Sequence, residues 1–206
     1  MNLTFGVVGV DAQIAFAQAI RTIKDVLHIN ENLHFEKSAD GQAFFGTSQP
    51  GGYFPVDKPF FLDSQRRLCI LNGHMWYRGH FPLFEEESIR QRSGAADELC
   101  LSGRINLEAI GGGVFNFFVY DELKESLFIA SDYSGIHPLY YAFSGKCLYF
   151  SNHIRILSKV LAKDYDPVGI IQRTSFHYTI GKRTLFEGIA RLRPGESLRY
   201  KVGENS

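Results

Sequence analysis

Residues 115–151, FNFFVYDELKESLFIASDYSGIHPLYYAFSGKCLYFS, carry the clearest fold signal in the chain. Short runs of aromatic and aliphatic residues alternate with polar turns, which is typical of successive strands. We predict strands at residues 115–120, 127–130, 139–143 and 146–150, a polar turn at 121–126, a loop at 132–138 and a two-residue turn at 144–145. This spacing indicates consecutive antiparallel hairpins.

The flanking sequence adds helices and further strands. Residues 3–10 are apolar and Val-rich, which predicts a first strand buried on both faces. Helical spacing predicts an amphipathic helix over residues 12–27, with Ile14, Phe16, Ala17, Ile20, Ile23 and Leu27 on its apolar side. We also expect helices at 153–161 and 167–174, one or two helices within 85–107, short strands around 44–45 and 53–54, and strands at 67–71 and 198–202. Asn72-Gly73 predicts a tight turn after the strand at 67–71. The fold class is α+β.

Composition excludes several classes of function. The 206 residues contain 22 Lys and Arg against 22 Asp and Glu, so the formal net charge is zero. A dedicated nucleic-acid binder or a polybasic membrane-surface protein needs an excess of basic residues. The three cysteines, Cys69, Cys100 and Cys147, fit neither a disulfide framework nor a zinc site. With no signal peptide and no long apolar run, we expect a cytoplasmic protein that binds no membrane.

Several motifs in register resemble the asparagine synthetase family. Residues 131–141, SDYSGIHPLYY, and 148–152, LYFSN, resemble its RDxxGxxPLYY and LxFAS block. Residues 184–195, TLFEGIARLRPG, resemble its TLFxGIxxLxPG motif, and residues 71–77, LNGHMWY, lie where that family carries NGEIYN. Residues 1–7, MNLTFGV, overlay MCGIFGV. The resemblance runs from residue 1 to about residue 200 and covers the N-terminal class II glutamine amidotransferase domain only.

The resemblance implies an Ntn-hydrolase fold, in which two antiparallel β-sheets are sandwiched between helices. It also implies glutamine hydrolysis by a cysteine at residue 2, whose thiol attacks the amide and whose free α-amine serves as base. Here residue 2 is Asn2, and a carboxamide nitrogen is no nucleophile. Leu3 replaces the family's glycine. We therefore predict no catalytic residue and interpret Asn2 as a degenerate nucleophile position.

The substrate pocket that the resemblance implies is also altered. Asn72 and Gly73 match the family's oxyanion hole, and His74 replaces its glutamate. The strand that carries its carboxylate-binding arginine falls near residues 44–56, which contain no Arg or Lys. We predict a relined pocket from Leu3, His74, Trp76 and Asp97, although strict register puts Ala96 at the family's aspartate and a one-residue shift restores Asp97. Asp132, Gly135, Pro138 and Tyr140 are interpreted as structural.

Other nucleophiles or metal sites find little support in the sequence. Thr4 would need cleavage after Leu3, and Cys69 lies in a predicted buried strand. A set of Cys69, His74 and His80 fits no zinc spacing, so we expect no metal. His137 and His177 are isolated.

Three functions stay open. The first is a glutaminase-inactive domain, spanning residues 1–202 with a tail or linker at 203–206, of an ATP-dependent amide-forming enzyme, as in β-lactam synthetases and lasso-peptide cyclases. Its role would be to scaffold a synthetase domain, in cis or in trans, or to cover that domain's substrate. ATP and Mg²⁺ would bind only that partner. The second is a binding module for a small molecule or peptide in the relined cavity, and the third is an active hydrolase. A homodimer is also left open.

Overall fold

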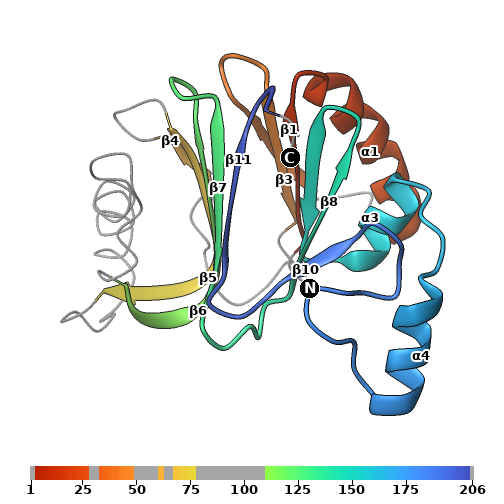
Figure 1. Ribbon diagram of the computed structural model, residues 1–206. Coiled ribbons are helices and arrows are strands. Elements are labelled where there is room, and N and C mark those ends of the chain that lie inside the picture. Colours follow the sequence, from red (N-terminus) through yellow and green to blue (C-terminus); the bar gives the residue numbers. More distant parts are fainter. Residues whose placement is uncertain (1–2, 28–32, 49–59, 63–66, 78–109, 205–206) are drawn as a thin grey trace.

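The computed structural model describes residues 3–27, 33–48, 60–62, 67–77 and 110–204 of the chain. Its elements form two antiparallel sheets that face each other, with two helices over the outer face of one sheet (Figure 1). The strands are β1 (Leu3–Gly9), β2 (Leu33–Lys37), β3 (Ala43–Ser48), β4 (Phe60–Leu62), β5 (Arg67–Tyr77), β6 (Ile110–Asp121), β7 (Ser126–Ser131), β8 (Leu139–Ser144), β9 (Cys147–Ser151), β10 (Ala190–Leu192) and β11 (Ser197–Lys201). The helices are α1 (Ala12–Leu27), α3 (Ile154–Val160) and α4 (Pro167–Phe176).

The six-stranded sheet has the order β10-β8-β9-β1-β3-β2, and the five-stranded sheet the order β11-β7-β6-β5-β4. Both hairpins expected within residues 115–151 are present, but they belong to different sheets. β6 and β7 pair in the five-stranded sheet, whereas β8 and β9 pair in the six-stranded one. The loop between β7 and β8 therefore carries the chain across the sandwich. The α+β prediction, with two antiparallel sheets and flanking helices, is confirmed.

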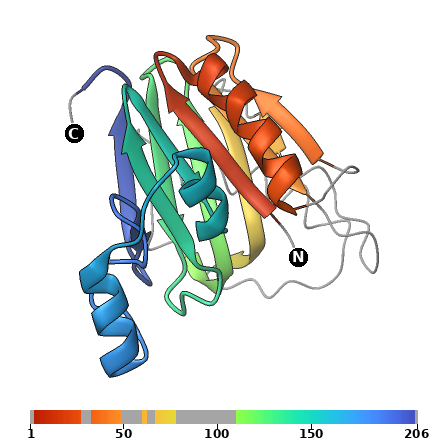
Figure 2. The same cartoon turned by 90° about the vertical axis from the view of Figure 1, so that its right-hand side faces the viewer.

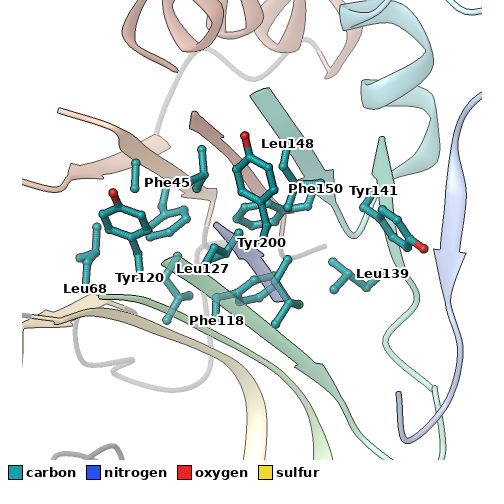
Figure 3. Close-up of a cluster of buried hydrophobic side chains, with 14 of the residues drawn as sticks. Phe45, Leu68, Phe118, Tyr120, Leu127, Leu139, Tyr141, Leu148, Phe150 and Tyr200 are labelled. Atoms are coloured by element: carbon teal, nitrogen blue, oxygen red, sulfur yellow. The ribbon is translucent and has the colours of Figure 1, made fainter. Parts of the chain in front are cut away.

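Every residue of β1 is buried, as predicted, because this strand is covered on both faces. One face meets the core between the sheets, where Phe45, Phe118 and Phe150 pack among aliphatic side chains and tyrosines (Figure 3). The rings of Phe118 and Phe150 stack at 4.9 Å between centroids, and so join the two sheets. The other face meets α1 and α3, which lie on the outer side of the six-stranded sheet (Figure 2).

Helix α1 has the predicted bounds, but part of its predicted apolar face is wrong. Ile14 is 64% exposed and Ala17 is exposed too. The helix instead buries Ala12, Ala15, Phe16, Ala19 and Ile23. These positions recur at three- and four-residue spacing, and the alanines let the helix approach β1 closely.

The predicted turn at Asn72-Gly73 is wrong. β5 continues through both residues to Tyr77, and their partners across β6 are Asn116 and Phe115. A long partner strand from far along the chain outweighs the local turn preference of an Asn-Gly pair.

The strands β2, β4 and β10 were not predicted. The predictions for residues 53–54 and 85–107 lie outside the described residues. None of the helices described here is long and apolar enough to cross a bilayer.

Candidate functional site

The start of β1 is held in place by three side chains from two other segments, the end of β3 and the end of β9. The backbone N–H of Leu3 donates to Ser48 Oγ at 3.2 Å, and that of Thr4 donates to Asn152 Oδ1 at 2.8 Å. The hydroxyl of Ser151 donates to the carbonyl of Thr4 at 2.9 Å. These bonds place the beginning of the chain between β3 and β9, in the middle of the six-stranded sheet.

Buried polar side chains gather at this end of the sandwich. Seven of them are at most 7% exposed: Thr4, Thr47, Ser48, Asn116, Ser131, Asp132 and Ser151. Strand register joins Thr4 to Thr47 in one sheet, and Asn116 to Ser131 in the other. The core of Figure 3 is apolar apart from its tyrosine hydroxyls. Because burying polar groups costs free energy unless they are hydrogen-bonded, such a cluster is typical of a site or a structural network.

Asn116 is the member of this cluster with an unused hydrogen-bonding atom. Its side chain is fully buried, and its Nδ2 donates to the carbonyl of His137 at 3.2 Å. Its Oδ1 has no hydrogen-bond partner among the residues that the structure describes. Asn116 alternates with Phe118 and Tyr120 along β6, so it lies on the face of the sheet that meets the core. Asn116 Oδ1 is therefore a buried acceptor that no described residue uses.

The β7–β8 loop borders the same end and is organised by one carboxylate. Asp132 Oδ2 accepts the N–H of Phe115 at 3.1 Å, and its Oδ1 accepts those of Ser134 and Gly135 at 2.6 and 2.9 Å. Gly135 has φ +60°, and a Cβ there would lie 2.5 Å from Pro194 Cγ. Pro138 ends the loop directly before β8. These contacts hold the β7–β8 loop in its conformation.

Tyr140, also interpreted as structural, lies inside the six-stranded sheet. It pairs with Ser151 of β9 and with Arg191 of β10. It thereby sits beside the strand that supports Thr4.

The other predicted site residues are placed unevenly. Asn2 and Asp97 lie outside the described residues, whereas Asn72, Gly73, His74 and Trp76 are described only as backbone of β5. Leu3 is 2% exposed and belongs to the cluster beneath α1. The relined pocket therefore stays a prediction.

Candidate nucleophiles and metal ligands are buried or scattered where the structure describes them. Cys69 and Cys147 are buried, and burial raises the pKa of the Cys147 thiol. His177 ends α4 in a left-handed conformation at the surface. Within the described ranges no three His, Cys, Asp or Glu side chains come together as metal ligands.

His153 is a site-border residue that the sequence reasoning did not single out. It caps α3 and follows directly on the residues that hold Thr4, and its N–H donates to Ser151 Oγ at 3.0 Å. Burial lowers the pKa of its imidazole, and the charge of Arg155 lowers it further. Asn116 was missed as well, although it interrupts an otherwise apolar strand, which was an available signal.

A cavity of about 310 Å³ lies at the opposite end of the five-stranded sheet. Its lining includes Arg67, Asp121, Arg199 and Lys201, close to the β6–β7 turn. Asp121 lies five positions along β6 from Asn116, which corresponds to roughly 17 Å along a strand. This cavity is therefore separate from the polar cluster at the start of β1.

Comparison with known proteins identifies the family. A family model described as a glutamine amidotransferase domain matches residues 95–206, which is more than half of the chain. The chain belongs to the glutamine amidotransferase domain family. No curated protein matches the chain.

Solved structures of amidotransferases share the fold. Glutamine phosphoribosylpyrophosphate amidotransferase from B. subtilis, complexed with ADP and GMP, aligns with a TM-score of 0.54 and 13% identity. A structure described as the allosteric regulatory enzyme of purine biosynthesis aligns with a TM-score of 0.54 and 14% identity. Each alignment covers 96% of this chain and 46% of the other, so this chain spans about half the length of the structures that it matches. The likeness establishes an Ntn-hydrolase-like amidotransferase fold.

Proposed function

We propose that this amidotransferase domain is glutaminase-inactive and serves an ATP-dependent amide-forming ligase or cyclase that resembles asparagine synthetase. Its role in that enzyme is to scaffold the synthetase domain or to cover its substrate. The observation that carries the proposal is Asn2, which occupies the position of the family's nucleophilic cysteine. A carboxamide has no titratable proton near neutral pH and cannot form the covalent intermediate that the reaction requires.

The described residues supply no substitute nucleophile. Thr4 is 1% exposed, and its backbone N–H and carbonyl are hydrogen-bonded to Asn152 and Ser151. It would need a free amino group to act as an N-terminal nucleophile. Cys69 and Cys147 are buried within strands of different sheets. Burial disfavours the thiolate, which is the reactive form of cysteine.

Membership of a ligase rests on the motifs. The stretches that resemble asparagine synthetase include the Asp132 loop and the Thr184 turn, where Thr184 Oγ1 donates to the carbonyl of Ile189 at 2.8 Å. Both stretches maintain the fold without a catalytic side chain. Each matched solved chain is more than twice as long as its part that aligns with this chain. A domain that functions only through its contacts with a partner would keep the residues that maintain the fold and could lose the nucleophile.

The proposal is tested by following ammonia release from glutamine. The wild-type chain is expected to release none above the rate without protein, and Asn2→Ala is expected to behave identically. Glutamine turnover that Asn2→Ala abolishes would refute the loss of activity. Reading the gene around residues 1–206 tests the ligase assignment, which predicts a polypeptide with an SGGxDS pyrophosphate loop in the same or a neighbouring frame.

A second candidate function is a binding module, and the unused Oδ1 of Asn116 favours it. A buried carbonyl oxygen without a partner needs a donor, such as a ligand amine or amide or an ordered water. Thermal-shift measurements with amino acids and short peptides test this function. A ligand that stabilises the wild-type chain but not Asn116→Leu would support it, whereas stabilisation of neither protein favours the scaffolding role.

A further inference from the structure

Helix α4 stands clear of the two sheets (Figures 1 and 2). Many of its side chains are both apolar and exposed. Seven of the fourteen large hydrophobic side chains exposed in the described part of the chain come from this helix and its flanks. We call them the α4 patch: Tyr165 63%, Val168 46%, Ile170 44%, Ile171 62%, Phe176 53%, Tyr178 61% and Ile180 52% exposed. The aromatic rings of Phe176 and Tyr178 lie 6.4 Å apart between centroids.

The helix has few contacts of its own to hold it. Gly169 is its one buried residue, and a Cβ there would lie 2.1 Å from the carbonyl oxygen of Thr184. Asp166 caps the helix by accepting the N–H groups of Val168 and Gly169 at 2.9 and 3.2 Å, and pairs with Arg183 at 2.5 Å. A ten-residue helix is marginal in water without tertiary packing. Packing of these apolar side chains against another surface would stabilise α4.

The size of the α4 patch matches a domain interface. Seven side chains about half exposed amount to on the order of 600 Å², since a large side chain presents roughly 150–250 Å². The largest apolar patch on a typical monomer is about 300–600 Å², so the summed exposed area of these side chains lies at the top of that range. Contacts between domains of one protein bury about 600–1,500 Å² in total.

The charges around the α4 patch distinguish between the partners that could bind it. Residues 167–183 carry Arg173, Lys182 and Arg183 but no Asp or Glu. Lys182 and Arg183 have carboxylate partners in Glu196 and Asp166, whereas Arg173 has none among the described residues. A two-fold contact centred near Arg173 would bring two Arg173 side chains together. A single unpaired cation is also too few for an anionic lipid surface, which attracts clusters of four to eight.

We propose that the α4 patch docks the ATP-dependent synthetase-like partner, through an apolar groove on that partner with carboxylates on its rim. The inference rests on the proposed function and adds the surface through which this domain would bind its partner. The matched solved chains extend well beyond the equivalent of this domain, so a domain of this fold can share its chain with a larger partner. Ile171 forms the centre of the contact, and Arg173 forms its charged border.

The test measures the affinity of the 206-residue chain for the SGGxDS-containing polypeptide encoded with it, by biolayer interferometry. Ile171→Glu is expected to weaken binding by about tenfold or more, as for a central interface residue. The matched control is Ile14→Glu on α1, which is equally exposed and is expected to change affinity less than about twofold. Tyr178→Glu serves as a second variant, and thermal melts verify that all three fold.

Equal affinity of wild type and Ile171→Glu overturns the docking surface while leaving the proposed function intact. Absence of binding by the wild-type chain overturns both. Sedimentation that shows a wild-type dimer, dissociated by Ile171→Glu, assigns the patch to a second copy and refutes the inference. Flotation with vesicles of phosphatidylcholine and phosphatidylserine refutes it if the wild type floats and Ile171→Glu does not.

Discussion

His153 shows how one residue couples this end of the fold to pH. It lies where β9 passes into α3, and its backbone shares the Ser151 hydroxyl that also bonds Thr4. Burial, followed by the charge of Arg155, lowers the pKa of its imidazole from the usual value of 6.5. The folded chain therefore favours the neutral ring.

This lowered pKa predicts a pH dependence with a definite sign. Between the unfolded pKa and the lower folded pKa, the unfolded chain binds more protons, so stability rises with pH. The free energy of unfolding should be fully retained above about pH 7 and should decline as the pH falls below 6.5. Urea titrations across this range should show that His153→Gln flattens the decline. His34→Gln, on the exposed strand β2, should leave it in place; an identical decline in both variants would exclude His153 as its source.

At the scale of elements, the hydrophobic pattern correctly predicted the helices and strands that depend mainly on their own sequence. The bounds of helix α1 and the strands of residues 115–151 follow from periodicity. The apolar residues mark the buried face of α1 only in part, because Ile14 and Ala17 are exposed. The continuation of β5 through Asn72-Gly73 was not predictable, because its cause is a partner strand about forty residues away. β2 and β10 are short strands at the edges of the six-stranded sheet, and their own sequences carry little strand signal.

The candidate site likewise contains residues that the sequence singled out and residues that it did not. Asp132 and Gly135 were predicted as structural from their motif, and the structure shows the loop that they build. The hydrogen bond from the Thr4 N–H to Asn152 Oδ1 was not predicted, because it joins residues 148 positions apart in the sequence. The bond from Asn116 Nδ2 to the carbonyl of His137 was not predicted either. A sequence shows which polar residues interrupt apolar strands, but pairing decides which of them meet.

The β7–β8 loop yields a prediction with a matched control. Gly135 and Gly145 have nearly the same backbone, with φ +60° and +59°. A Cβ at Gly135 would collide with Pro194, whereas a Cβ at Gly145 would meet nothing within 4 Å. Gly145→Ala should cost about 1 kcal/mol through its left-handed conformation alone. Gly135→Ala should cost about 2–4 kcal/mol, because the collision adds to it. Equal losses in urea unfolding would show that the Pro194 contact is unimportant.

At the scale of the whole molecule, a hydrogen bond fastens the two sheets together at the end away from the candidate site. Tyr120 of β6 donates its hydroxyl to Asp40 Oδ2 at 2.8 Å, in the turn between β2 and β3. Asp40 Oδ1 also accepts the hydroxyl of Ser38 and the N–H of Gln42, so the turn is rigid around the carboxylate. Burial, followed by the hydrogen bond to Asp40, raises the pKa of Tyr120 and keeps its hydroxyl a donor.

Breaking this fastening should weaken the sandwich as a unit. Tyr120→Phe should lower the free energy of unfolding by about 1–2 kcal/mol, because Asp40 loses a partly buried donor. The control is Tyr140→Phe, whose hydroxyl makes no hydrogen bond to the described residues, and it should change stability by less than about 0.5 kcal/mol. Both variants should keep a single cooperative transition in urea. Two separate transitions in Tyr120→Phe would show that the sheets fold independently.

The whole molecule thus has an amidotransferase fold, and we propose that Asn2 stands at its nucleophile position. The most direct test of that claim is intact mass spectrometry after incubation with 6-diazo-5-oxo-norleucine, an electrophilic analogue of glutamine. The account predicts the mass of the unmodified chain, with or without Met1. A stable adduct located at the processed N-terminus by peptide mapping would contradict it.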